Sequence, residues 1–490
     1  MSIGQRALAA VVAGIVLAGC QHDASSGNNL KSLLDQGPDA ETRALLDEDL
    51  AEVLERQEKA IGTYTTTVNT GAAAVPMNAL IENALARNPT IGHAAQAINQ
   101  ADAERMRAIY ARLPQVYINF SYDGVRQNVR DSDNAVFERG KANYPVATSS
   151  ASLVQPLFDP ARRYRVQRAK SVQSGAEVDY IAAVRDVVFE VFDNYIVASQ
   201  AKARIASLQE RRYLLNRQIN SQGALVDTGL SNVLQSSSLR SERDTIAAEE
   251  SLESARRAEA LSNLSQLTGL VVSDLAPLDF PDDLLNAPGR VNVEQAVSTA
   301  LENNPAIMSA ALQVVSTEFE RKEAHASDIS PVLEAYATIE REDRSNSRFG
   351  GGSLTVDETV GVSLTIPIFN ANGTGLSEPT KRMEVRTAAL RYHARKRSVE
   401  TEIRTAHARL GELSKAIRQS KNAAYHASRA LEVERNRVSS GESVDLAVAA
   451  RQLRVNESRA QVAFYEAEFL RAWARLNYLM GADLTTQQGF

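Results

Sequence analysis

Apolar and polar residues alternate in three short rows of this chain, and this period of two predicts strands with one apolar and one polar face. A weaker fourth segment covers residues 147–156. Two pairs of strands of about 8–10 residues each are therefore expected, with polar loops over residues 123–146 and 341–357. The apolar members of the three rows are Val116, Ile118, Phe120 and Tyr122; Leu333, Ala335, Ala337 and Ile339; and Val360, Val362, Leu364 and Ile366.

A helical pattern precedes each pair of strands. The first predicted helix covers about 77–112, and its counterpart covers about 291–328. Each ends shortly before a proline, Pro114 or Pro331, because the residue before a proline is disfavoured in helical conformation.

A much longer helix follows each strand pair. The first is expected to begin at Asp159-Pro160, an N-cap followed by proline at the first helical position, and to run to about 222. The second covers about 376–439. A glycine-containing turn and a returning helix of about 38 residues follow each, and such lengths indicate coiled-coil pairing. Seams with spacings of three and four residues support this: Ile181, Val184, Val188, Val191, Tyr195 and Ala198 in the first helix, and Ile403, Ala406, Leu410, Leu413, Ile417, Ser420, Ala424, Ala427 and Leu431 in the second.

The second half of the chain repeats the first. Three pairs of segments match in the same order, which indicates an old duplication: 79–89 with 296–305, 153–159 with 364–370, and 229–269 with 441–481. The domains expected from this pattern are a signal peptide at 1–19, a tether with a short helix at 20–75, one repeat at 76–269, a linker at 270–290, a second repeat at 291–481 and a tail at 482–490.

The N-terminus has the pattern of a bacterial lipoprotein signal. Arg6 precedes an apolar run over residues 7–18, which is too short to span a membrane. The run leads into Leu17-Ala18-Gly19-Cys20, and Cys20 is the only cysteine of the chain. We therefore expect lipidation of Cys20, with a plain signal peptide as the alternative, and the Gln21 that follows favours the outer membrane.

Composition and motifs argue against several classes of function. The net charge of −6 gives no basic surface for nucleic acid. The sequence contains neither a G-x-S-x-G elbow nor a P-loop, and it provides no metal-ligand spacing. We therefore expect a protein that is not an enzyme and that has neither a cofactor nor a metal. Its histidines, which lie apart from one another, are His22, His93, His325, His393, His407 and His426.

Four strands cannot close a barrel alone, so they must close with other chains. The duplicated order of elements resembles the TolC-like outer membrane efflux family. The junctions Pro156-Leu157-Phe158 and Pro367-Ile368-Phe369 and the turns at 228–235 and 440–446 carry the same resemblance.

The resemblance implies a mostly α fold with a small β part, assembled as an elongated trimer. Its strands would form a twelve-stranded barrel in outer-membrane lipid, continuous with a helical coiled-coil barrel in the periplasm. The complex would serve as the passive outer-membrane channel of a tripartite efflux or type I secretion system. Its partners would be a periplasmic adaptor and an inner-membrane transporter.

The resemblance also implies sites at the turn end of the long helices. Asp445 matches the position of an acidic ring at the tunnel constriction, with a solvated surface residue or a helix cap as the alternatives. Gly229 and Gly441 are expected to adopt positive φ. The turn residues expected to contact the adaptor are Gly229, Leu230, Ser231, Gly441, Ser443 and Val444.

Two alternatives to a channel remain. A structural coiled-coil lipoprotein without transport activity would explain the helices and leave the four alternating strands unexplained. A membrane-anchored hydrolase would need a catalytic constellation. Within the family, residues 21–75 lack the Gly-Pro-Asp-Tyr-like segment of many drug-efflux lipoproteins and carry a charged helical pattern at 41–61, which weakens an assignment to drug efflux over secretion.

Overall fold

The fold is that of a computed structural model of the chain. The chain divides into two compact units, Met1–Tyr64 and Thr65–Phe490, and the described residues belong to the second. The predicted signal peptide, Cys20, the tether up to residue 73 and the tail at 482–490 lie outside the described residues. The described residues are 74–130, 140–227, 233–278, 280–286, 289, 291–347, 351–368, 377–442 and 444–481.

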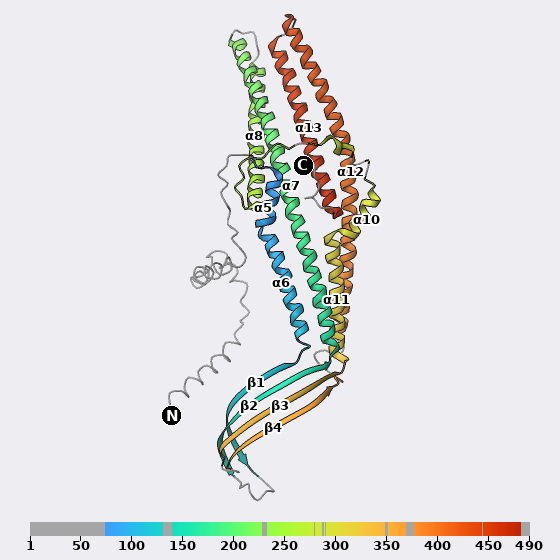
Figure 1. Ribbon diagram of the computed structural model, residues 1–490. Helices are drawn as coiled ribbons and strands as arrows, with labels where there is room; N and C mark the ends of the chain where they lie inside the picture. Colours follow the sequence, from blue (N-terminus) through green and yellow to red (C-terminus); the bar gives the residue numbers. More distant parts are fainter. Residues whose placement is uncertain are drawn as a thin grey trace, which may run out of the picture. The chain divides into compact units, whose positions relative to one another are not determined.

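Both halves of the second unit contain the same elements in the same order: two short helices, two strands, a long helix and a returning helix (Figure 1). The first half comprises α5 (Met77–Arg87), α6 (Pro89–Tyr110), β1 (Gln115–Val129), β2 (Gly140–Phe158), α7 (Pro160–Asp227) and α8 (Val233–Thr268). The second half comprises α10 (Val293–Asn303), α11 (Pro305–Ile329), β3 (Val332–Ser347), β4 (Gly351–Thr365), α12 (Ser377–Ser439) and α13 (Asp445–Met480). The segment between the halves carries a short 3-10 helix, Asp282–Asn286.

The expectation of one continuous helix before each strand pair is wrong. The first helix breaks at Asn88 and its counterpart breaks at Asn304, each directly before a proline. Both asparagines have extended backbone, with ψ of 123° and 119°, because a following proline disfavours helical conformation. Each asparagine then caps the next helix: its Oδ1 accepts from the amide of Thr90 (2.9 Å) or of Ala306 (3.0 Å).

The same two asparagines join helices that are far apart in sequence. Asn88 Nδ2 donates to the carbonyl of Leu267 near the end of α8 (3.0 Å), and Asn304 Nδ2 donates to the carbonyl of Leu479 near the end of α13 (2.8 Å). Both asparagines are buried. Each returning helix therefore ends against the start of α6 or α11, and we call these two contacts, at Asn88 and Asn304, the joints. The long helices α7 and α12 pack against other helices on both sides of their joint.

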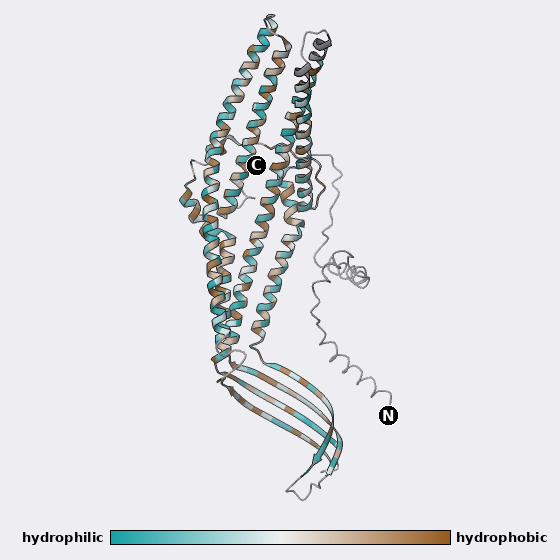
Figure 2. Cartoon of the chain, turned by 180° about the vertical axis from the view of Figure 1, so that it is seen from behind, coloured by the Kyte–Doolittle hydropathy of each residue, from teal (hydrophilic) through white to brown (hydrophobic). Residues whose placement is uncertain are grey.

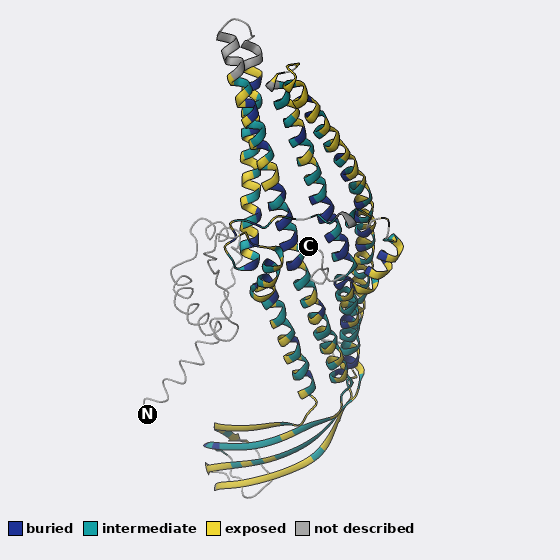
Figure 3. Cartoon of the chain, turned by 45° about the horizontal axis from the view of Figure 1, so that its top comes forward, coloured by how far each residue is buried: buried dark blue, intermediate teal, exposed yellow. Residues whose placement is uncertain are grey.

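The long helices pack through the apolar seams predicted for them. On α12, Ile403, Leu410 and Ile417 are fully buried, in a cluster with side chains of α10 and α13. On α7, the corresponding cluster faces α5 and α8. Ile181 is the exception among the predicted seam residues of α7, because it is half-exposed. At this point of the helix the neighbouring Tyr180 packs against the cluster instead. Figure 3 shows buried positions concentrated on the helices and exposed ones along the strands.

The strands form one antiparallel sheet in the order β1-β2-β3-β4. They contain 15 to 19 residues and are longer than expected. The predicted loops at 123–146 and 341–357 are wrong in extent, because pairing continues through polar residues: Asp123 opposes Val146, and Arg341 opposes Val356. Hydrophobic alternation fades there while main-chain hydrogen bonding, which does not depend on side chains, continues.

None of the helices within the described ranges is both long and apolar enough to cross a membrane.

We predict that Asn304→Asp destabilises the fold by about 2–3 kcal/mol, because the Leu479 carbonyl loses its donor and gains a buried carboxylate as neighbour. Thermal unfolding followed by circular dichroism measures the effect as a lower melting temperature. Asn303→Asp is the control, since the Asn303 amide makes only an exposed hydrogen bond to the carbonyl of Thr299 (3.1 Å). Equal melting temperatures for the two variants would contradict the role of the joint.

Candidate channel wall and helix-turn end

One face of the sheet is apolar and exposed. Residues paired across the register share a face, so Val116, Leu153, Ala337 and Val360 form one row across all four strands. Val360 is 85% exposed. Figure 2 shows apolar and polar positions alternating along the strands. This face has the pattern of a surface that contacts lipid.

The opposite face of the sheet is polar. Tyr117, Ser152, Thr338 and Thr359 form one row across it. The next row adds charge through the pair Glu340 and Asp357, which oppose each other on β3 and β4. A sheet with one apolar and one polar face suits a wall between lipid and water.

Both edges of the sheet are open. Among the described residues, β1 pairs only with β2, and β4 pairs only with β3. The outer main-chain groups of these two strands therefore need partners from elsewhere.

At the opposite end of the helices, a tight turn connects α12 to α13. Gly441 has the positive φ that was expected, 76°. Residues other than glycine rarely adopt this backbone conformation. The amide of Glu442 donates to the carbonyl of Arg437 (2.9 Å), and the amide of Gly441 donates to that of Val438 (3.1 Å). These bonds end α12 in the manner of a glycine C-cap, and the following Val444 is exposed.

Asp445 is the first residue of α13, and the N-cap of that helix is Val444, which makes no side-chain cap hydrogen bond. The N-cap position of the returning helix is therefore taken by Val444, and the role of Asp445 stays a prediction. The corresponding turn of the first half connects α7, which ends at Asp227, to α8, which begins at Val233. Gly229, Leu230, Ser231 and Ser443 lie outside the described residues.

Sequence reasoning missed a buried carboxylate near this turn. The Glu434 side chain is only 8% exposed, and Arg437 and Arg451 lie 3.8 and 3.7 Å from it. Arg451 belongs to α13, so this group joins the two helices before they reach the turn. The sequence did hold a signal for this burial, because Glu434 follows Leu431 by three residues and so continues the apolar seam of α12.

A second missed residue joins the two helix pairs. Arg211 of α7 forms ion pairs with Glu242 of α8 at 2.6 Å and with Glu457 of α13 at 3.5 Å. All three side chains are partly exposed, so this contribution to stability is small. Its position matters more, because it bridges the first-half hairpin to the second.

The end of α13 docks on α7 through Tyr478. Its hydroxyl donates to Asp186, and its carbonyl accepts from Arg185 Nη2 at 2.8 Å. Burial, followed by the hydrogen bond to Asp186, raises the pKa of Tyr478 to about 12. The hydroxyl therefore stays protonated and keeps donating throughout the physiological pH range.

Within the described ranges, no three histidine, cysteine, aspartate or glutamate side chains gather in a group that could hold a metal ion.

Comparison with known proteins adds a family and a fold. The family model described as outer membrane efflux protein matches residues 80–270 and 296–482, one match in each half. The proteases secretion protein PrtF of Dickeya chrysanthemi is 22% identical over 371 residues, which cover 74% of this chain and 78% of that protein. The nickel-cobalt-cadmium resistance protein NccC of Alcaligenes xylosoxydans xylosoxydans is 22% identical over 365 residues, covering 71% and 76%.

Two solved structures share the fold. The outer membrane protein VceC of Vibrio cholerae superposes with a TM-score of 0.66 at 16% identity, covering 83% of this chain and 96% of that one. The CmeC outer membrane channel of Campylobacter jejuni gives a TM-score of 0.66 at 16% identity, covering 83% and 85%.

Proposed function

Because this chain belongs to the outer membrane efflux protein family, we propose that three copies of it form the outer-membrane channel of a tripartite efflux or type I secretion system. The channel conducts substrates passively from an inner-membrane transporter across the periplasm and the outer membrane. The observation that carries this proposal is the four-stranded sheet, with its exposed apolar face and two open edges.

The geometry of the sheet supports closure with other copies. β1 and β3 run away from the helices while β2 and β4 run back, so β4 of one copy can pair antiparallel with β1 of the next. An edge left open in lipid would cost several kcal/mol for each unpaired main-chain group. Three copies give a twelve-stranded barrel with its apolar face toward lipid.

The partners of the channel follow from its two ends. The sheet is the membrane end, so the turns at the far end of the long helices face the periplasmic adaptor and the transporter. We place the adaptor contacts at Gly441, Ser443 and Val444 of the second turn. The contacts of the first turn are Gly229, Leu230 and Ser231.

The names of the relatives point to different substrates, protease secretion in one case and resistance to nickel, cobalt and cadmium in the other. At 22% identity to each, neither substrate class carries over to this chain. The structural lipoprotein without transport activity leaves the apolar sheet unused, so nothing in the fold favours it over a channel.

We predict that Gly441→Val reduces export while leaving the oligomer intact. A β-branched residue at a φ of 76° strains the turn by about 1–3 kcal/mol and displaces the adaptor contacts. Light scattering of the detergent-solubilised protein should give three copies for wild type and variant. Export of a dye or a secreted protein, measured in cells with the variant as sole copy, should fall several-fold.

Gly411→Ala is the control for the turn variant, since Gly411 lies within α12 with open space where a Cβ would stand. A stable monomer would contradict the proposed assembly. Wild-type export by Gly441→Val would contradict only the docking role of the turn.

We also propose that Asp445 forms an acidic ring at the periplasmic mouth. Three carboxylates around one axis attract cations into the constriction. Asp445→Ala should therefore lower cation selectivity and weaken block by divalent cations in planar bilayers by several-fold. Glu442→Ala is the control, because Glu442 lies at the same turn outside the ring position, and an equal effect of both variants would remove Asp445 from the mouth.

Lipid anchoring at Cys20 is the last part of the proposal. A mature chain that begins at an acylated cysteine gains membrane affinity in addition to that of the barrel. Mass spectrometry of the N-terminal peptide should show a diacylglycerol-modified Cys20, and an unmodified cysteine would exclude the anchor without affecting the channel.

A further inference from the structure

A cavity of about 600 Å³ lies where the helices of the first half meet the sheet. The end of α6, the end of β2 and the first turn of α7 surround it, at the junction of helices and strands seen in Figure 1. Its volume falls within the range of sites for small molecules. Apolar and basic side chains share its lining, among them Leu113, Leu157 and Phe158, and Arg112, Arg162 and Arg163.

Two side-chain hydrogen bonds hold the walls of this junction cavity together. The guanidinium group of Arg162 donates to the carbonyl of Ala111 at the end of α6. Gln155 Nε2, at the end of β2, donates to the carbonyl of Arg112 at 3.1 Å. A single arginine side chain therefore spans the gap between the start of α7 and the end of α6, which brings Arg163 and Arg112 to the same small opening.

The junction cavity has more positive than negative charge. Asp159 is the acidic side chain of its lining, and it already pairs with Arg162 at 2.8 Å. Arg162 also lies 3.5 Å from Glu334. Arg112 and Arg163 are exposed, and neither pairs with an acidic side chain of the described residues. These two cations are therefore available to an anion from outside the chain.

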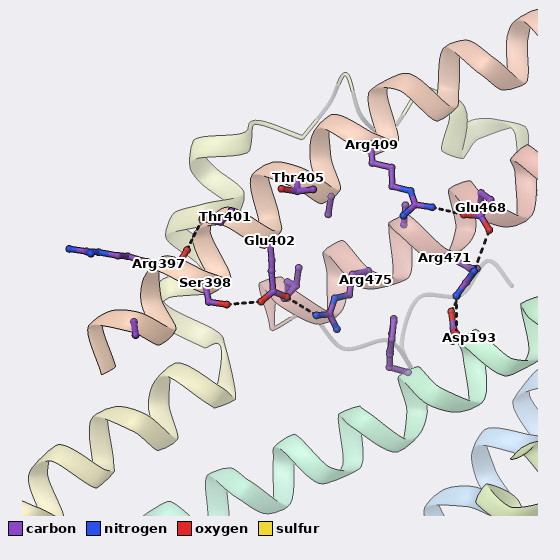
Figure 4. A pocket seen from close by; sticks show the side chains of 15 residues that line it. Asp193, Arg397, Ser398, Thr401, Glu402, Thr405, Arg409, Glu468, Arg471 and Arg475 are labelled. Carbon is purple, nitrogen blue, oxygen red and sulfur yellow. Dashed lines mark hydrogen bonds and ion pairs between the residues drawn. The ribbon is translucent and has the colours of Figure 1, made fainter. Parts of the chain in front are cut away.

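Arginines of a larger groove, about 830 Å³ among α7, α12 and α13, have carboxylates of the chain as partners instead. Arg471 lies 2.6 Å from Asp193, and Arg475 lies 2.6 Å from Glu402 (Figure 4). These ion pairs join one helix to another, and their charges balance within the chain. The two cations of the junction cavity have no such partner among the described residues.

The strand register shows on which side of the sheet the junction cavity opens. Gln155 opposes Ala335, and Phe158 opposes Leu333 after the irregularity at the end of β2. Ala335 and Leu333 belong to the apolar row of β3, and residues paired across the register share a face. The cavity therefore opens on the apolar face of the sheet, next to the exposed side chain of Phe158.

The apolar face is richest close to this junction. On β1, which starts at the helices, the exposed apolar residues come first, and Arg126 follows on the same face farther out. Beyond β4, apolar exposure continues to Ile368, which is 93% exposed. If this face contacts lipid, which rests on the proposed function, the junction lies at the boundary between lipid and water on the helical side. The apolar residues of β1 are Val116, Ile118, Phe120 and Tyr122.

We propose that the junction cavity binds the headgroup of an anionic phospholipid. Arg112 and Arg163 take its phosphate, and its acyl chains lie along the apolar face beyond Leu113 and Phe158. Guanidinium groups bind phosphate oxygens through paired, charge-assisted hydrogen bonds. A headgroup with no positive charge of its own, such as that of phosphatidylglycerol, suits two unpaired arginines better than a zwitterionic one does. The site is present once in each copy of the chain.

The test uses the full-length protein in detergent, to which phosphatidylglycerol or phosphatidylcholine is added in mixed micelles. Native mass spectrometry counts the bound lipid. Wild type should retain one phosphatidylglycerol per chain and bind it about tenfold more tightly than phosphatidylcholine, since one charge-assisted contact is worth that much. The double variant Arg112→Gln/Arg163→Gln should bind phosphatidylglycerol about tenfold more weakly and lose the preference.

The matched control is Arg240→Gln/Arg459→Gln. It also removes two positive charges from exposed arginines, on α8 and α13, whose residues lie far from the sheet. This control should keep the wild-type preference for phosphatidylglycerol. Inorganic phosphate, added as a competitor, distinguishes a lipid site from a site for free phosphate.

Four results would contradict the headgroup site. Protein that conducts in planar bilayers but binds both lipids equally would overturn it and leave the channel function standing. Equal losses in the two double variants would overturn it as well. Displacement of phosphatidylglycerol by an equal concentration of inorganic phosphate would show that the acyl chains contribute nothing. Protein that neither enters bilayers nor retains lipid would refute the proposed function, and the headgroup site with it.

Discussion

Two asparagine side chains join the helix ends on which the arrangement of the helices depends. Asn88 and Asn304 each cap one helix with the side-chain oxygen and bond the last turn of another helix with the side-chain nitrogen. A buried amide that satisfies partners on both sides fixes the two ends to one geometry. The broken helices therefore continue one another, and only α7 and α12 run uninterrupted past the joints.

The helices and the sheet of this chain differ in whether they can bury their apolar surface without other molecules. The uninterrupted helices and their jointed partners bury apolar seams without help from another copy. The sheet does not, because its apolar face and its two edges remain open. Helical packing can therefore form within one chain, while the strands need lipid and neighbouring copies.

The sequence was informative wherever local chemistry decides the structure. Periodicity predicted the strands, the seam of α12 and the glycine turn at Gly441. It missed the breaks at Asn88 and Asn304, although the rule about residues before proline applies there as well, because the apolar pattern continues through them. Strand length was underestimated because polar residues pair as well as apolar ones do.

The contact between α13 and α7 could not be read from the sequence at all. The ion pair between Asp193 and Arg471 joins residues 278 positions apart, and only the packing of the two helices brings them together. Asp445 could be proposed for the mouth only through family resemblance, since an acidic residue at the start of a helix is common on any surface.

The uninterrupted length of α12 has a mechanical consequence. The helix is held at its middle by the fully buried Ile403, Leu410 and Ile417, and about 30 residues separate this anchor from the turn. At about 1.5 Å per residue that arm is on the order of 40 Å long. Glu434 ties α12 to α13 near the turn, so the two helices together can act as one stiff lever, and a tilt of only about 5° at the anchor moves the tip by roughly 3–4 Å. In the proposed trimer, a modest force on the turns would therefore change the spacing between the helix tips.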